Sequence, residues 1–352
     1  MAKFNFRLPI ETELTRKQRR AIDSEEQILL TGVPGSGKTV VSIFRLSNAV
    51  QRNEHVILFT YNRMLKMAIR NSATTLGLKA ENINNIHKWF YETTGLWLTE
   101  YENNYEELSK KINAKFDEIL FDEGQDLPLS IYKAFKEKSQ VSIGADDAQK
   151  LYEVDTTEVK ILEIMPNLIR HELDENFRNS FEIFNFAKEF VPNNARAHDE
   201  ELLRKLPRDN ADKPYIYINE SLDKNKEMMG KIILANKGAN IGILAPDKVL
   251  LEIYYKALKD EHTCSIYYNE LTEERKLETE NNLQNILFTT FKSAKGMEFD
   301  IVIMSGFELI DDDRRRQYFV GATRAKSKLF ILAIKNLPPI FNKFDESTYI
   351  LQ

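Results

Sequence analysis

The stretch Gly32-Val33-Pro34-Gly35-Ser36-Gly37-Lys38-Thr39 decides the fold of this chain, because it fits the pattern G-x-x-x-x-G-K-[ST]. It follows an apolar, strand-like segment at residues 27–31 and precedes a helix-like pattern that runs to about residue 50. In that setting the glycines let several backbone N–H groups turn toward a phosphate, and the following helix adds a favourable dipole. The pattern predicts a nucleotide-binding loop, although it does not by itself specify the reaction.

Two residues of this loop have specific expected roles toward ATP. Lys38 would reach the β and γ phosphates, and the Thr39 hydroxyl would hold Mg²⁺. The predicted nucleotide-binding residues of this segment are Gly32, Pro34, Gly35, Ser36, Gly37, Lys38, Thr39 and Val40. The alternative is a glycine-rich turn that happens to precede a helix, and it is disfavoured because strand and helix patterns both flank the loop.

A pair of acids follows the apolar, strand-like segment at residues 118–121. Asp122 would hold Mg²⁺ through its hydration shell, and Glu123 would orient and deprotonate a water aimed at the γ-phosphate. In a kinase the position of Glu123 would face an acceptor hydroxyl instead. A solvated acidic turn is the simpler alternative, and the phosphate loop upstream argues against it.

Composition bounds the class of protein. The chain has 352 residues, which suits two domains of ordinary size. Its net charge of −5 argues against a surface coated in basic residues, but a basic cleft for nucleic acid remains compatible with it. The one cysteine, Cys264, cannot form an internal disulfide, which predicts a reducing compartment. With neither a secretory signal pattern nor a membrane-spanning apolar run, we expect a soluble, cytoplasmic protein.

Short apolar segments alternate with amphipathic stretches along the whole chain, which predicts an α/β fold with parallel sheets covered on both faces. A domain boundary is expected near Asn167, giving domains at 1–166 and 167–352. Residues 93–110 and 261–285 are read as short insertions or connections. The expected strands lie at residues 27–31, 55–59, 118–121, 141–144, 169–173, 215–218, 241–244, 286–290, 301–304 and 329–332.

The segment Asp122-Glu123-Gly124-Gln125-Asp126 resembles the D-E-x-Q-D element of UvrD/Rep-like superfamily 1 helicases. Five further segments resemble that family's motifs in the same order, so the resemblance covers nearly the whole chain. They are residues 14–22 (glutamine motif), 145–149 (G-D-x-x-Q), 175–179 (N-Y-R-S), 291–299 (H-S-A-K-G-L-E-F) and 318–325 (Y-V-G-V-T-R-A).

The resemblance implies two tandem RecA-like P-loop domains, with ATP in the cleft between them and hydrolysis gated by domain closure. It also implies roles for individual residues, as follows. Gln18 would read the adenine edge, Phe177 would stack on adenine, Glu298 would contact the ribose, Gln149 would sense the γ-phosphate, Arg178 would reach that phosphate, and Arg324 would be the arginine finger. The implied cofactors are ATP and Mg²⁺.

The sequence departs from the family pattern at several places. The family's large insertions are reduced here to residues 93–110 and 261–285, so the chain resembles a bare two-domain motor. After the G-D-x-x-Q motif at residues 145–149, the family usually has an aromatic residue and an arginine, whereas this chain has Tyr152-Glu153-Val154-Asp155. Val40 stands where the family often has an arginine that faces adenine. Ala145 replaces a glycine, and Lys292 replaces a histidine.

Contacts to nucleic acid are implied by the resemblance rather than by composition. The candidates are Asn62, Arg63, His87, Trp89 and Lys292. For Trp89 the alternative is core packing at helical spacing, and for His87 it is a polar residue at a helix start.

Two functions stay open. The first is an ATP-dependent DNA helicase or translocase acting on single-stranded DNA, with RNA as an alternative. The second is a regulatory ATPase subunit that switches a protein partner, such as a nuclease, in a DNA-processing or phage-defence complex. A small-molecule kinase is disfavoured by Glu123, Gln149 and the two arginines.

Overall fold

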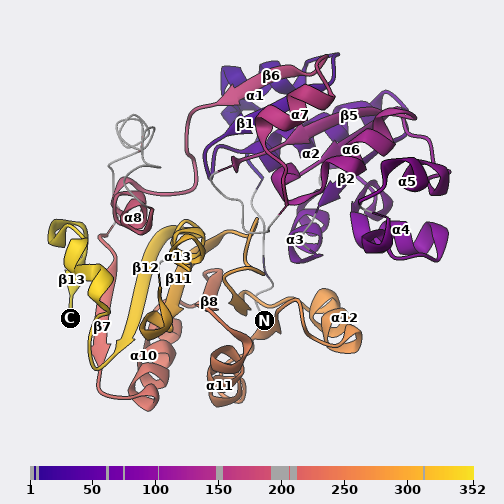
Figure 1. The fold of residues 1–352 in the computed structure, drawn as a ribbon. Helices are drawn as coiled ribbons and strands as arrows, with labels where there is room; N and C mark the ends of the chain where they lie inside the picture. Colours follow the sequence, from indigo (N-terminus) through magenta and orange to yellow (C-terminus); the bar gives the residue numbers. More distant parts are fainter. Residues whose placement is uncertain are drawn as a thin grey trace. The chain divides into compact units, whose positions relative to one another are not determined.

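The computed structural model folds into two compact units (Figure 1). One unit is Phe6–Glu175, and the other combines Met1–Asn5 with Asn176–Gln352. Each unit is built on a parallel sheet flanked by helices, so the predicted α/β class is confirmed, and the arrangement is that expected of two RecA-like domains. The structure describes residues 4, 8–60, 63–73, 76–101, 103–147, 154–191, 206, 212–311 and 314–352.

The first unit contains a six-stranded sheet in the order β3-β2-β4-β5-β1-β6, and every neighbouring pair is parallel. Its strands are β1 (Ile28–Gly32), β2 (Val56–Thr60), β3 (Ile83–Asn85), β4 (Glu118–Phe121), β5 (Gln140–Gly144) and β6 (Ile169–Leu173). Its helices are α1 (Arg16–Ile22), α2 (Lys38–Gln51), α3 (Arg63–Ala73), α4 (Ile86–Thr94), α5 (Tyr105–Lys111), α6 (Leu129–Lys136) and α7 (Glu158–Ile164).

Helices cover this sheet on both faces. Alternate residues of β1 point to opposite faces, and each set packs in a different apolar cluster with helices. Leu29 packs in a cluster with buried residues of α4, α5, α6 and α7. Ile28 and Leu30 pack in another cluster with buried residues of α1 and α2. A strand buried on both faces reads as a continuous apolar run, which is why β1 and β4 could be recognised in the sequence.

The second unit contains a seven-stranded parallel sheet in the order β13-β7-β12-β11-β8-β10-β9. Helices α10 and α11 pack on strands through one apolar cluster, and α8 and α13 contact β12. The strands are β7 (Tyr215–Asn219), β8 (Ile241–Ala245), β9 (Ser265–Tyr267), β10 (Ile286–Thr290), β11 (Phe299–Ser305), β12 (Ala325–Ile334) and β13 (Ile350–Leu351). The helices are α8 (Phe181–Ala187), α10 (Leu222–Ala235), α11 (Lys248–Leu258), α12 (Glu273–Asn281) and α13 (Arg315–Ala322).

One strand belongs to a different unit from the one predicted. A boundary at residue 167 assigns the segment 169–173 to the second domain, whereas β6 pairs with β1 over its whole length in the first sheet. The strand is an edge strand with mostly exposed side chains, so its sequence shows no apolar face that would identify its partner. Strands β3, β9 and β13 were not predicted, because each is only two or three residues long.

The topology of the first sheet brings the predicted motifs to one edge. Strand β5 lies between β1 and β4, so the carboxyl ends of all three strands are neighbours. The phosphate loop follows β1, Asp122 follows β4, and Asp146 follows β5. In parallel α/β sheets this edge is where ligands bind. Among the described residues, no helix is long and apolar enough to cross a membrane.

Candidate active site

The phosphate loop favours glycine at two positions, where φ is positive and a Cβ would come close to a neighbouring segment. Gly32 has a φ of +146°, and a Cβ there would lie 2.2 Å from the carbonyl oxygen of Leu173. Gly37 has a φ of +87°, and a Cβ there would lie 2.5 Å from Nε2 of Gln18. The loop therefore turns sharply between β1 and α2, with its backbone close to neighbouring segments.

Lys38 begins α2 and folds its side chain back over the loop. Its Nζ donates to the carbonyls of Gly32 at 2.6 Å and Val33 at 3.0 Å, and it pairs with Asp146 Oδ2 at 3.2 Å. The Lys38 ammonium is thus held beside the loop by three oxygen atoms, in a side chain that is only 9% exposed.

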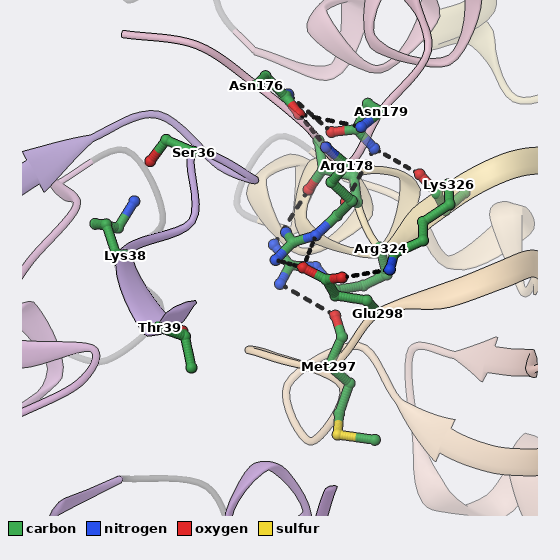
Figure 2. Close-up of polar contacts among 12 residues, drawn as sticks. Ser36, Lys38, Thr39, Asn176, Arg178, Asn179, Met297, Glu298, Arg324 and Lys326 are labelled. Atoms are coloured by element: carbon green, nitrogen blue, oxygen red, sulfur yellow. Dashed lines mark hydrogen bonds and ion pairs between the residues drawn. The ribbon is translucent and has the colours of Figure 1, made fainter. Parts of the chain in front are cut away.

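Ser36 supplies an independent sign that the loop is built for a ligand. The residue is 1% exposed, and its Oγ has no hydrogen-bond partner among the described residues. A buried hydroxyl without a partner costs about 1–3 kcal/mol, so such groups are rare unless a ligand or water satisfies them. A phosphate oxygen in the loop would accept the hydrogen bond that Ser36 lacks. Figure 2 shows Ser36, Lys38 and Thr39 along the loop and the start of α2.

Thr39 and Asp122 meet across the carboxyl edge of the sheet. The Thr39 hydroxyl donates to Asp122 Oδ2 at 2.9 Å, which places two oxygen ligands side by side. Burial raises the pKa of Asp122 to about 7, and the negative charge of Glu123 adds to that shift. A carboxylate that is so poorly solvated favours a nearby cation, and this pair of oxygen donors fits Mg²⁺.

Glu123 has a constrained backbone and a fixed side chain. Its φ is +58°, which is unusual for a residue that carries a Cβ. Gln125 Nε2 donates to Glu123 Oε2 at 2.6 Å, while Gln125 Oε1 accepts from the backbone N–H of Asp146 at 2.9 Å. Gln125 is fully buried, so it connects the predicted base to the loop after β5. Strained, over-determined residues of this kind cluster at functional sites.

Gln18 is placed beside the loop, but its amide already has partners. Its Oε1 accepts from the backbone N–H of Thr15 at 2.9 Å as part of a capping box on α1. Its Nε2 donates to the Ser36 carbonyl at 3.1 Å. Gln18 thus supports the loop in this structure, and its contact with adenine stays a prediction. Val40 is partly buried against the cluster that contains α1 and α2, and Pro34 is buried.

The second unit carries an ion-pair cluster around Glu298 (Figure 2). Arg178 Nη2 lies 2.8 Å from Glu298 Oε1, and Lys326 Nζ lies 2.8 Å from Glu298 Oε2. Burial would raise the pKa of Glu298, but the two cations outweigh it and hold that pKa at about 2. Both carboxylate oxygens are engaged, so the contact with a ribose stays a prediction. Arg178 Nη1 is buried and has no hydrogen-bond partner in the described part of the chain, which leaves this NH₂ group available to an anion.

Two asparagines join the motif at residues 175–179 to the one at residues 318–325. Asn176 Oδ1 accepts from the backbone N–H of Arg178 and Asn179, which fixes the turn that carries Arg178. Asn179 Nδ2 donates to the carbonyls of Thr323 at 3.1 Å and Ala325 at 2.6 Å. The two segments that carry Arg178 and Arg324 are therefore held together within one unit (Figure 2).

Arg324 is fully buried in this structure. Its Nε donates to the Val320 carbonyl at 3.0 Å, and its Nη1 lies 3.5 Å from the Met297 carbonyl. An arginine finger would have to leave these carbonyls to reach a phosphate, so that role stays a prediction. Phe177, by contrast, is 53% exposed and free to stack on a flat ligand.

The candidate nucleic-acid residues have different environments. Lys292 is exposed and lines a pocket of about 330 Å³ at the carboxyl ends of β8 and β10. Arg63 begins α3 and is partly buried. His87 is partly buried, and that burial lowers its pKa. Trp89 is 8% exposed and packs on Phe59 at 5.0 Å between ring centroids, so the structure supports the core-packing alternative for it. Asn62, Gln149, Tyr152 and Glu153 lie outside the described residues.

Sequence reasoning gave no role to four residues that shape the two clusters. These are Gln125 and Asp146 in the first unit and Asn179 and Lys326 in the second. The first three lie inside the motifs at residues 122–126, 145–149 and 175–179, so their place in a motif could have marked them as site residues. Lys326 follows the last motif directly, and nothing in the sequence links it to Glu298.

One family model matches a segment of the second unit. Residues 285–332 match the family model of the UvrD-like helicase C-terminal domain, a segment that contains Lys292, Glu298 and Arg324. The resemblance to UvrD/Rep-like superfamily 1 helicases is therefore confirmed, and a helicase-type function is supported. No curated relative matches the sequence.

Two solved structures illustrate the structural neighbours. The C-terminal domain of a possible DNA helicase from Lactobacillus plantarum WCFS1 is 21% identical, with a TM-score of 0.39, and the match covers 50% of this chain and 98% of that chain. The Arterivirus nonstructural protein 10 (helicase) is 12% identical, with a TM-score of 0.44, and the match covers 94% of this chain and 64% of that chain. Because both TM-scores are below 0.5, we take no functional conclusion from them.

Proposed function

We propose that this chain is an ATP-dependent superfamily 1 helicase or translocase that hydrolyses ATP on single-stranded nucleic acid. The observation that carries the proposal is the hydrogen bond of 2.9 Å between Thr39 and Asp122, beside a loop that holds the buried, unpartnered Ser36 hydroxyl. This set of oxygens and N–H groups fits a magnesium-bound triphosphate better than a neutral ligand.

The first unit would bind the nucleotide through its phosphate loop. Lys38 would exchange the carbonyls of Gly32 and Val33 for phosphate oxygens, which are stronger partners because they are charged. Ser36 would gain the acceptor that it lacks. Thr39 and Asp122 would hold Mg²⁺, which when bound would neutralise charge on the phosphates.

Glu123 is the proposed general base. Gln125 donates to one carboxylate oxygen and so orients the side chain, and a carboxylate held in this way can accept a proton from water. Burial and the negative charge of Glu123 raise the pKa of Asp122 to about 7, and a cation bound beside Asp122 would favour its charged form. Gln125 also contacts Asp146, which pairs with Lys38, so the base is connected to the phosphate-binding lysine.

Arg178 and Arg324 are proposed to supply positive charge to the transferred phosphate in the ATP-bound state. Arg178 has a free, buried N–H donor and a side chain fixed by Glu298. Arg324 shares the same asparagine-linked framework. Arginine charge on the leaving phosphoryl group is among the larger contributions to this chemistry, at roughly 10³–10⁵-fold in related enzymes. The two units would then be the two motor domains.

A second candidate function rests on the short segment between α4 and β4. In the family this region carries a large insertion, whereas here residues 93–110 form only the end of α4, one short turn and most of α5. The chain could therefore act as a regulatory ATPase subunit that switches a partner such as a nuclease, with little unwinding of its own.

Two assays separate these functions. The helicase proposal expects ATP hydrolysis to rise on adding single-stranded DNA or RNA, and a tailed duplex to be separated in an ATP-dependent way. Hydrolysis that neither nucleic acid stimulates would refute it. Stimulated hydrolysis without strand separation by the purified chain would favour the regulatory subunit instead.

A further inference from the structure

Two large aromatic side chains are stacked on the surface of the first unit. The rings of Tyr91 and Trp97 lie 4.4 Å apart between centroids, with 27° between their planes. Tyr91 is 45% exposed and Trp97 is 57% exposed. Neither residue belongs to a motif of the proposed ATPase, so the function proposed above does not account for them.

The backbone holds this pair in place rather than leaving it to collapse. Helix α4 ends at Thr94 and is capped by Gly95, whose φ is +72° and whose N–H donates to the Tyr91 carbonyl at 2.8 Å. Leu98, directly after Trp97, is 1% exposed and packs in the core beside Phe90. The two rings are thus a preformed platform, and preformed surfaces bind with a smaller loss of conformational entropy.

The segment that carries the two rings is acidic, and Lys88 lies one helical turn before it. Residues 91–107 contain Glu92, Glu100, Glu102, Glu106 and Glu107 but no lysine or arginine. Of these acids, Glu92 lies 3.8 Å from Lys88, a distance at which exposed pairs contribute little. Such a surface repels the phosphates of a nucleic acid and attracts cations.

Other tyrosines of this segment already accept cations from within the unit. Lys111 Nζ lies 5.8 Å from the ring centroid of Tyr101, and Lys133 Nζ lies 5.8 Å from that of Tyr105. Within the described residues, no lysine or arginine lies over the Tyr91–Trp97 pair. Unlike Tyr101 and Tyr105, the rings of Tyr91 and Trp97 can therefore accept a cation from another molecule on their outer faces.

We propose that Tyr91 and Trp97, flanked by Glu92 and Glu100, form a docking surface for an arginine- or lysine-bearing segment of a partner protein. The rings would stack on a guanidinium or ammonium group, and the carboxylates would supply charge complementarity. This inference is independent of ATP hydrolysis, and it places a protein rather than a nucleic acid on this surface.

The two tryptophans make the test direct, because Trp89 is in the core and Trp97 is on the surface. The probe is a fluorescently labelled hexa-arginine peptide, titrated with the full chain at low ionic strength and followed by anisotropy. Unlabelled peptide should also change the emission of Trp97. We expect saturable binding that salt weakens, and weaker binding by about 2- to 5-fold for each ring removed in Tyr91→Ala or Trp97→Ala.

A charge control separates the surface from general attraction to an acidic protein. The double variant Glu92→Gln with Glu100→Gln should weaken binding, whereas Glu274→Gln, an exposed acid on α12, should leave it unchanged. Equal binding by wild type and both ring variants would overturn the proposal. So would a single-stranded oligonucleotide that perturbs Trp97 emission more strongly than the peptide does. ATPase rates and melting curves of all variants should match wild type, which shows that they fold.

Discussion

Replacing Asp122 by asparagine should stabilise the first unit while abolishing its activity. Asp122 is 2% exposed, and burial together with the charge of Glu123 raises its pKa from 3.8 to about 7. Below the unfolded pKa the carboxyl is neutral in both states and costs nothing. As pH rises toward 7, the unfolded chain ionises first, so folding stability falls across this window.

The magnitude follows from the two pKa values. At roughly 1.4 kcal/mol for each pH unit, the difference between 3.8 and about 7 corresponds to about 4 kcal/mol of lost stability. Asparagine removes this cost and can still accept from Thr39. Its NH₂ group needs a new partner, which offsets about 1–3 kcal/mol. We therefore expect a net gain of about 1–3 kcal/mol near pH 8, which turns into a net loss of about 1–3 kcal/mol by about pH 4.

Urea unfolding followed by tryptophan emission measures this effect in the correct unit, because Trp89 and Trp97 both lie within Phe6–Glu175. The experiment compares wild type, Asp122→Asn and the control Asp260→Asn without Mg²⁺ at several pH values. Asp260 is exposed, so its change should stay within about 0.5 kcal/mol. A loss of stability in Asp122→Asn near pH 8, or a difference that does not vary with pH, would refute the reasoning.

Three further predictions follow from single contacts. Lys38→Ala should lower the turnover of ATP by about 100-fold or more, because it removes the cation beside the loop; an ordinary phosphate-release rate would contradict this. Glu118→Gln should destabilise the first unit by about 3–5 kcal/mol in urea unfolding, since it leaves the buried Arg45 guanidinium without its charge partner, and an unchanged midpoint would count against it. Asn179→Ala should destabilise the second unit by about 2–5 kcal/mol in calorimetry, because two buried carbonyls lose their donor; a shift confined to the first unit's transition would be inconsistent with it.

The parts of the fold that sequence predicted well are those with a local signal. The segments 118–121, 169–173 and 286–290 coincide with β4, β6 and β10 to the residue. Strands β4 and β10 are buried and largely apolar, and that pattern is visible without knowledge of the partner strand. The sheet to which β6 belongs was not visible, because strand pairing depends on contacts between residues far apart in the chain.

The candidate site divides in the same way. Lys38, Thr39 and Asp122 could be chosen from motif letters, since glycine spacing and the end of a strand are local properties. The pairing of Glu298 with Lys326 and that of Lys38 with Asp146 required the folded chain. Trp89 shows the limit most clearly: an aromatic residue near a helix start suits either a stacking surface or a core, and only its burial decides.

The most direct test of the proposed hydrolysis is phosphate release by wild type and Glu123→Gln, each with and without single-stranded DNA. We predict release by wild type that DNA stimulates, and no release by Glu123→Gln under either condition, with magnesium–ATP binding retained because Lys38, Thr39 and Asp122 are intact. Glu123→Gln that releases phosphate at the wild-type rate would contradict the assignment of the base. Wild type that releases none, with or without DNA, would contradict the ATPase itself.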